Sequence, residues 1–144
     1  MRFTLLLLAL PAFGQFRSIE ITFEGMGCAS CIESMPARMK RMRGVESATV
    51  EGNILKMTLA EQNRVKIEQV RDAIEQDGTK TKRASVVVMG ELRREGDQWL
   101  LKTPGSSYKL EYSGALSEGA HLVRGEIEGM RSIVIALKSH PEKK

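Results

Sequence analysis

The chain contains only two cysteines, two histidines and 5% aromatic residues among its 144 positions. Two cysteines exclude the small disulfide-stapled class, which needs several pairs. Scarce aromatics argue against base stacking, and interleaved acids and bases with a net charge of +4 indicate a solvated surface rather than a nucleic-acid stripe. The sequence shows no Ser/His/Asp arrangement, phosphate loop or paired carboxylates. We therefore expect neither an enzyme nor a nucleic-acid-binding protein.

One short, continuous apolar run stands out, at the N-terminus. Arg2 precedes the apolar residues 5–10, and the small residues Ala12 and Gly14 follow them. This order of charge, apolar core and small residues is typical of a secretory signal peptide, and the run is too short to span a bilayer. We expect residues 1–14 to be removed. The mature protein would then be soluble, exported to the periplasm or the extracellular space, and without a transmembrane segment.

The first half of the chain follows the order strand, helix, strand, strand, helix, strand. Alternating apolar residues predict a strand at 18–24, and apolar residues at helical spacing predict a helix that ends at Gly44. A second helix is expected after Asn63 as its N-cap and before Gly78. The remaining strands of this half are predicted at 45–50, 54–59 and 79–88.

The first predicted helix combines methionines with basic residues and one proline. Met35, Met39 and Met42 lie at helical spacing, which favours core packing over metal ligation by their thioethers. The basic run 38–43 is interpreted as a solvated helix face, with docking of an acidic partner as the alternative. Pro36 lacks a backbone donor, so it predicts either a kink in the helix or a helix start closer to Pro36.

The second half of the chain is rich in strand patterns and glycine turns, without a helical pattern. Short strands separated by Gly-rich turns predict a small barrel at 86–138. This segment is similar to OB-like domains of exported bacterial proteins, and an SH3-like barrel is the alternative. Residues 139–144 are expected to be a disordered tail. The individual strands are predicted at 86–92, 98–102, 108–112, 121–127 and 132–137.

Both cysteines lie in the segment Gly25-Met26-Gly27-Cys28-Ala29-Ser30-Cys31, between the first predicted strand and helix. A Cys-x-x-Cys pair at a helix N-terminus places two sulfurs near the positive end of the helix dipole, which favours thiolates. Two soft ligands suit Cu(I) or Hg(II) in near-linear geometry, whereas a closed structural zinc site needs four ligands. The same pair could instead form a disulfide or act as a redox dithiol, which an oxidising compartment favours.

The strand, the Gly-Met-x-Cys-x-x-Cys loop, the helix and the Gly-Val pair at its end together resemble a heavy-metal-associated domain over residues 17–88. The resemblance implies a ferredoxin-like βαββαβ fold, with Cys28 and Cys31 as metal ligands and Met26 and Gly27 shaping the loop. It implies Cu(I) as the bound ion, with Hg(II), Zn(II) or Cd(II) as alternatives. It also implies a metal-transporting ATPase or a cuproprotein as the acceptor.

The chain departs from this family pattern after the second predicted helix. Family members often place an aromatic or lysine side chain close to the metal there. In this chain Thr79 follows Gly78, and the nearest lysine is Lys80. The sequence therefore leaves open which side chain screens the charge of the thiolates.

The sequence predicts an α+β protein in four parts: a signal peptide (1–14), a ferredoxin-like heavy-metal-associated domain (15–85), an OB-like β-barrel domain (86–138) and a tail (139–144). We expect an exported protein that sequesters or transfers a soft metal ion through Cys28 and Cys31, without catalysis. One alternative is an extracytoplasmic thiol-disulfide redox protein that uses the same pair. The other is an interaction module of the cell envelope that acts through its β domain.

Overall fold

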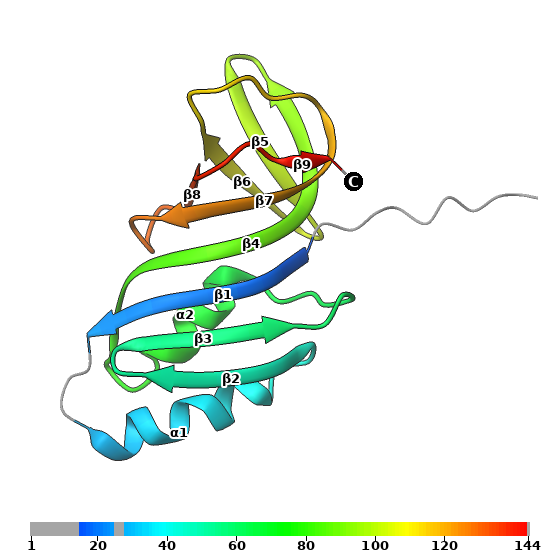
Figure 1. Ribbon diagram of the computed structural model, residues 1–144. Coiled ribbons are helices and arrows are strands. Elements are labelled where there is room, and N and C mark those ends of the chain that lie inside the picture. The colour runs from blue at the N-terminus through cyan, green and yellow to red at the C-terminus, as the bar shows by residue number, and fades with distance from the viewer. Residues whose placement is uncertain (1–14, 25–27, 144) are drawn as a thin grey trace, which may run out of the picture.

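The computed structural model describes residues 15–24 and 28–143, and its strands form one sheet of nine (Figure 1). The predicted α+β class and the βαββαβ order of the first half are confirmed. The predicted signal peptide, residues 1–14, lies outside the described residues. The elements are β1 (Gln15–Glu24), α1 (Ala29–Lys40), β2 (Val45–Glu51), β3 (Ile54–Leu59), α2 (Ile67–Glu75), β4 (Lys80–Glu95), β5 (Gln98–Thr103), β6 (Ser106–Glu111), β7 (Gly119–Ile127), β8 (Val134–Leu137) and β9 (Glu142–Lys143).

In the first half, antiparallel strands in the order β2-β3-β1-β4 are packed against both helices. Alternate residues of β1, namely Ile19, Ile21 and Phe23, are at most 1% exposed. They share one core with Met35 and Met39 of α1, which are fully buried. The prediction that these methionines serve core packing is confirmed. Burial of each such side chain contributes about 1.5–3 kcal/mol, so this core fixes the position of α1 on the sheet.

Asn63 is not the N-cap of the second helix, because α2 begins only at Ile67. The Asn63 side chain instead holds the loop before α2. Its Nδ2 donates to the carbonyl oxygens of Phe16 at 2.9 Å and Ala60 at 2.7 Å, and its Oδ1 accepts from the N–H of Val65 at 3.1 Å. The N-cap prediction is therefore wrong. The physical reason is that buried backbone groups of this loop need partners, and the amide of Asn63 supplies them.

Strand β4 belongs to both halves of the molecule (Figure 1). It pairs with β1 as far as Met89 and with β5 from Glu91 onward, while β7 pairs with its other edge. Gly90 lies at this exchange of partners, where a Cβ atom would come within 2.5 Å of Leu101 Cδ1. The missing side chain thus allows β5 to approach closely as β4 leaves one layer and enters the other.

The second half is a closed ring of strands in the order β4-β5-β6-β8-β7, completed by the pairing of β7 with β4. The β6–β8 pair is parallel and the other pairs are antiparallel. This ring has the strand number of the predicted OB-like barrel, an assignment that stays a prediction. The ring and the first half meet without a linker, because β4 crosses the expected domain boundary at residues 85 and 86.

Helix α2 also joins the two halves. The hydroxyl of Tyr108 in β6 donates to Glu68 at 3.0 Å, and Arg131 forms an ion pair with Glu75 at 3.0 Å. Arg71 donates to the carbonyl oxygen of Met130 at 2.8 Å. The helix that covers the first sheet is therefore bound to the loop between β7 and β8 and to the barrel wall.

The C-terminal segment differs from the disordered tail expected at 139–144. Leu122 and His121 of β7 pair with Glu142 and Lys143 of β9, and Pro141 is buried. The backbone groups at the start of β7 would otherwise lack partners on that edge, and β9 supplies them.

Gly125 marks a close approach between β7 and β8. A Cβ atom there would lie 2.5 Å from Ile135 Cγ2 and 2.8 Å from the carbonyl oxygen of Ala136. Because a backbone oxygen in a ladder cannot rotate away, Gly125→Ala should lower the free energy of unfolding by about 1–3 kcal/mol, measured by urea denaturation. Gly129→Ala is the matched control, since no atom lies within 4 Å of its added methyl group. Equal effects of the two substitutions would contradict the close approach of β7 and β8 at Gly125.

Candidate functional site

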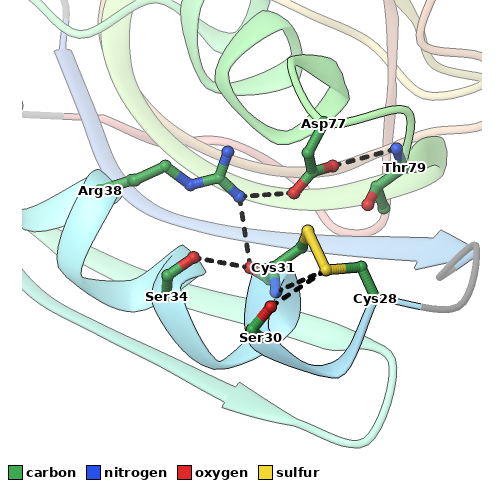
Figure 2. The surroundings of a disulfide bond; sticks show 7 residues. All are labelled: Cys28, Ser30, Cys31, Ser34, Arg38, Asp77 and Thr79. Carbon is green, nitrogen blue, oxygen red and sulfur yellow. Dashed lines mark hydrogen bonds and ion pairs between the residues drawn. A yellow bond between two sulfur atoms is a disulfide. The ribbon is translucent and has the colours of Figure 1, made fainter.

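The fold brings Cys28 and Cys31 together at the start of α1 (Figure 2). Cys28 is the N-cap residue, with an extended backbone, and Cys31 lies in the first turn of the helix. Their Cα atoms are 5.1 Å apart, and their sulfur atoms form a disulfide. Both residues are partly exposed. The two predicted loop-shaping residues, Met26 and Gly27, lie outside the described residues.

Polar groups of the same turn surround the sulfur of Cys28. The backbone N–H of Cys31 donates to Cys28 Sγ at 3.3 Å, and the hydroxyl oxygen of Ser30 lies 3.1 Å from it. The first turn of α1 contains no acidic residue, and the positive end of the helix dipole lies at this turn. Once the disulfide is reduced, these groups stabilise negative charge on the Cys28 sulfur, which is the form that binds soft metal ions.

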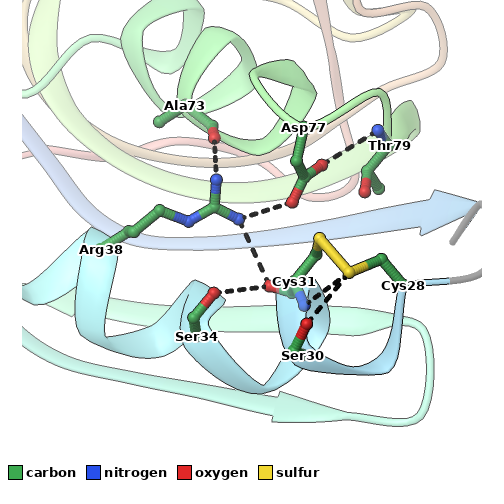
Figure 3. A network of polar contacts seen from close by, with 8 residues as sticks. All are labelled: Cys28, Ser30, Cys31, Ser34, Arg38, Ala73, Asp77 and Thr79. Carbon is green, nitrogen blue, oxygen red and sulfur yellow. Dashed lines mark hydrogen bonds and ion pairs between the residues drawn. A yellow bond between two sulfur atoms is a disulfide. The ribbon is translucent and has the colours of Figure 1, made fainter.

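Arg38 connects the cysteine turn to the end of α2 (Figure 3). Its Nη2 donates to Asp77 Oδ2 at 2.9 Å and to the carbonyl oxygen of Cys31 at 3.4 Å, and its Nη1 donates to the carbonyl oxygen of Ala73 at 3.3 Å. The side chain is only 22% exposed. Arg38 is therefore not part of the solvated basic face that the run 38–43 predicts. The residues of that run that do lie exposed are Lys40, Arg41 and Arg43.

Pro36 lies inside α1 without ending it. It has no N–H to donate to the carbonyl of Ile32, four residues earlier. The preceding carbonyl, that of Cys31, accepts from the hydroxyl of Ser34 at 3.1 Å as well as from Arg38. Side chains thus bind the backbone of the turn that the proline would weaken. The helix begins at Ala29, which excludes the alternative of a start near Pro36.

Asp77 is the acidic member of this network and lies in the turn between α2 and β4. Its Oδ1 accepts from the backbone N–H of Thr79 at 3.1 Å, and its side chain is 15% exposed. Hydrogen bonding from the Thr79 side chain, and then from the Thr79 N–H and Arg38, lowers the pKa of Asp77 from its ordinary 3.8 against the opposing effect of burial. The sequence analysis did not identify Arg38 or Asp77 as neighbours of the cysteines.

The lowered pKa of Asp77 predicts that its contribution to the free energy of unfolding depends on pH. Because its pKa is lower in the folded chain, ionised Asp77 stabilises the fold above the unfolded-state value, and this contribution is lost as pH falls through the folded value. Asp77→Asn should therefore lower the free energy of unfolding at about pH 6 more than at about pH 3, measured by urea denaturation. Asp97→Asn, which changes an exposed carboxylate, is the control. A difference from wild type that is equal at both pH values would contradict the assignment.

The described residues offer no larger metal-binding cluster, since nowhere among them do three or more His, Cys, Asp and Glu side chains gather in a way that could hold an ion. His121 is 2% exposed, and its Nδ1 lies 3.0 Å from the carbonyl oxygen of Gly119. It is therefore a buried structural residue. Within the same described ranges, no helix has the length and apolar character needed to cross a membrane.

A separate concave surface of about 700 Å³ lies on the barrel, between the start of β5 and the end of β6. Trp99, Tyr112 and Leu116 form its apolar part. Carboxylates among its lining residues would repel a phosphate backbone, which disfavours nucleic acid as an occupant. These carboxylates belong to Glu95, Asp97 and Glu111.

No protein-family model and no curated protein matches the chain. Among solved structures, the chain is similar to the CopZ metallochaperone, with 26% identity over 44% of this chain and 97% of that chain and a TM-score of 0.40. It is similar to a copper binding domain from HMA7, a P-type ATPase, with 26% identity over 49% and 92% of the two chains and a TM-score of 0.39. A third is the N-terminal domain of a potential copper-translocating P-type ATPase from Bacillus subtilis in the Cu(I)-loaded state, with 23% identity over 46% and 84% and a TM-score of 0.39.

Proposed function

We propose that the protein is an exported carrier of soft metal ions, which holds Cu(I) between Cys28 and Cys31 for sequestration or for transfer to a metal-transporting ATPase or a cuproprotein. One observation carries the proposal: the two sulfurs lie together, partly exposed, at the N-terminus of α1. As thiolates they are two soft ligands, and Cu(I) is a soft ion that two such ligands can bind. Hg(II), Zn(II) and Cd(II) are the competing ions.

Metal binding requires prior reduction of the disulfide. Two molecules of a thiol such as glutathione supply two electrons, giving the dithiol of the protein and one oxidised glutathione. The ion then displaces the thiol protons as it binds. An ion with two protein ligands on an exposed turn can accept a ligand from a partner before it leaves the first sulfur. This suits transfer between proteins better than permanent storage.

The proposal is tested by titrating the reduced protein with Cu(I), without oxygen, in competition with a chromogenic Cu(I) chelator. We expect about one ion per chain, or per pair of chains, and none in the Cys28→Ser/Cys31→Ser double variant. Wild-type protein that does not compete with the chelator would overturn the copper proposal. The same competition repeated with Hg(II), Zn(II) and Cd(II) would then rank the other ions.

The disulfide itself favours a second candidate, a thiol-disulfide redox protein in the same exported compartment. The two functions differ in what the reduced pair does. A redox protein would exchange its disulfide rapidly with a substrate thiol and would not retain Cu(I) against the chelator. Retention of Cu(I) together with slow exchange supports the carrier.

The concave surface on the barrel supports the third alternative, an interaction module of the envelope that acts through its β domain. This function is independent of the cysteines. Partner binding that persists in the Cys28→Ser/Cys31→Ser variant, and is lost in Trp99→Ala, would assign the activity to the barrel.

A further inference from the structure

The charge of Arg38 is fixed beside the cysteine turn by contacts from three segments. The guanidinium binds the carbonyl oxygen of Cys31 in α1, the carbonyl oxygen of Ala73 in α2, and the carboxylate of Asp77 in the turn before β4. Figure 3 shows the guanidinium between the end of α2 and the Cys31 turn. Because both carbonyl contacts are independent of Asp77, Arg38 remains anchored when that carboxylate is neutralised.

The arginine is not an optimal choice for stability alone. Its Nε is buried and has no hydrogen-bond partner among the described residues. A buried donor without a partner is destabilising, because it has lost its bonds to water. The hydrogen bonds of Arg38 are formed by its two terminal nitrogens, to the carbonyl oxygens of Cys31 and Ala73 and to Asp77.

The reduced site has an excess of negative charge that the cysteine turn cannot balance by itself. Two thiolates carry two negative charges, and one Cu(I) neutralises only one of them. In the segment after α2, Thr79 is buried and its N–H donates to Asp77, while Lys80 is exposed at the start of β4. Among the described residues, Arg38 is the cationic side chain that donates a hydrogen bond to a cysteine residue, at the carbonyl oxygen of Cys31.

We propose that Arg38 and Asp77 form a charge pair whose two members act on the cysteines in opposite directions. Together they set the reduction equilibrium of the Cys28–Cys31 disulfide and the Cu(I) affinity of the two cysteines. Arg38 stabilises the anionic sulfurs, and Asp77 opposes this effect. The copper part rests on the proposed carrier function, whereas the redox part does not. A purely structural ion pair would behave differently, because loss of either partner would then perturb the site in the same direction.

The test is the metal-free equilibrium between the full-length protein and glutathione at one fixed, mildly alkaline pH. One protein disulfide and two glutathione molecules give one protein dithiol and one oxidised glutathione. Arg38→Gln should shift the equilibrium constant about tenfold toward the disulfide, equal to a potential about 30 mV more negative. Asp77→Asn should shift it in the opposite direction. The double variant should return close to the wild-type value.

Two variants serve as controls. Arg41→Gln removes an exposed positive charge of the segment that follows α1 and should change the constant less than about twofold. Arg38→Lys keeps the charge without the planar fork and should lie closer to wild type than Arg38→Gln does. Circular dichroism establishes that each variant is folded. Shifts of the same sign for Arg38→Gln and Asp77→Asn, or equal shifts for Arg38→Gln and Arg41→Gln, would overturn the proposal.

The chelator competition supplies the copper arm of the test. Arg38→Gln should bind Cu(I) about tenfold more weakly, and Asp77→Asn should bind it more tightly than wild type. If wild type itself retains no Cu(I), the carrier function fails while the glutathione equilibrium still decides the role of the charge pair. If Cu(I) is retained and neither variant changes its affinity, the charge pair fails while the carrier stands.

Discussion

Serine in place of either Cys28 or Cys31 is expected to abolish Cu(I) retention. Each single variant leaves one thiolate and one neutral hydroxyl, and a hard oxygen is a poor ligand for a soft monovalent ion. Loss of an outer-shell partner typically lowers metal affinity 10–100-fold, so loss of a ligand should lower it by more than about 100-fold. The measurement is the affinity for Cu(I) in competition with the chelator, for each reduced variant separately.

Ser30→Ala provides the matched control for the cysteine variants. Its hydroxyl lies 3.1 Å from Cys28 Sγ, so it belongs to the same turn without being a soft ligand. We expect an effect no larger than that of an outer-shell partner, about tenfold. If Cys28→Ser and Ser30→Ala weaken binding equally, or if only one cysteine matters, the ion is not held between the two sulfurs.

Asn63→Ala is expected to cause the largest loss of stability among single polar substitutions. Asn63 is 5% exposed, and its amide forms three hydrogen bonds with backbone groups of two separate segments. Alanine removes these partners at once and leaves buried backbone groups unsatisfied. We expect the free energy of unfolding to fall by about 2–4 kcal/mol, measured by urea denaturation.

Gln62→Ala is the control for this substitution, because Gln62 is the exposed neighbour of Asn63 in the same loop. Its effect should stay within about 0.5 kcal/mol. Asn63→Asp should also destabilise, since it keeps the acceptor for Val65 but loses the donor to Phe16 and Ala60. An Asn63→Ala variant as stable as Gln62→Ala would mean that water replaces the amide in this loop.

The sequence alone was sufficient to predict those parts of the fold that depend on a local periodicity of apolar residues. Alternation along β1 and the helical spacing of Met35 and Met39 locate the core of the first half, and both are confirmed. The role of Asn63 could not be derived in this way. An asparagine side chain can cap a helix N-terminus or form hydrogen bonds with the backbone of a buried loop. The tertiary contact with Phe16 decides between these two roles.

The cysteine pair was visible in the sequence, but its charged neighbours were not. Arg38 lies seven residues after Cys31, which places both on one face of a helix. That spacing was the available signal, but it was overlooked because Arg38 was grouped with the other basic residues of 38–43. Asp77 comes from a turn remote in sequence, so its proximity depends on how α2 packs against α1. No local pattern encodes that packing.

Because β4 runs through both halves of the molecule, each half pairs with strand edges that the other half would otherwise expose. Residues 84–92 of this strand pair with β7. A fragment trimmed at residue 95 would expose that edge as a row of unpaired N–H and C=O groups, which is a template for self-association. The barrel therefore protects the cysteine-bearing half from edge-to-edge aggregation. This protection comes from strand pairing alone and requires no ligand.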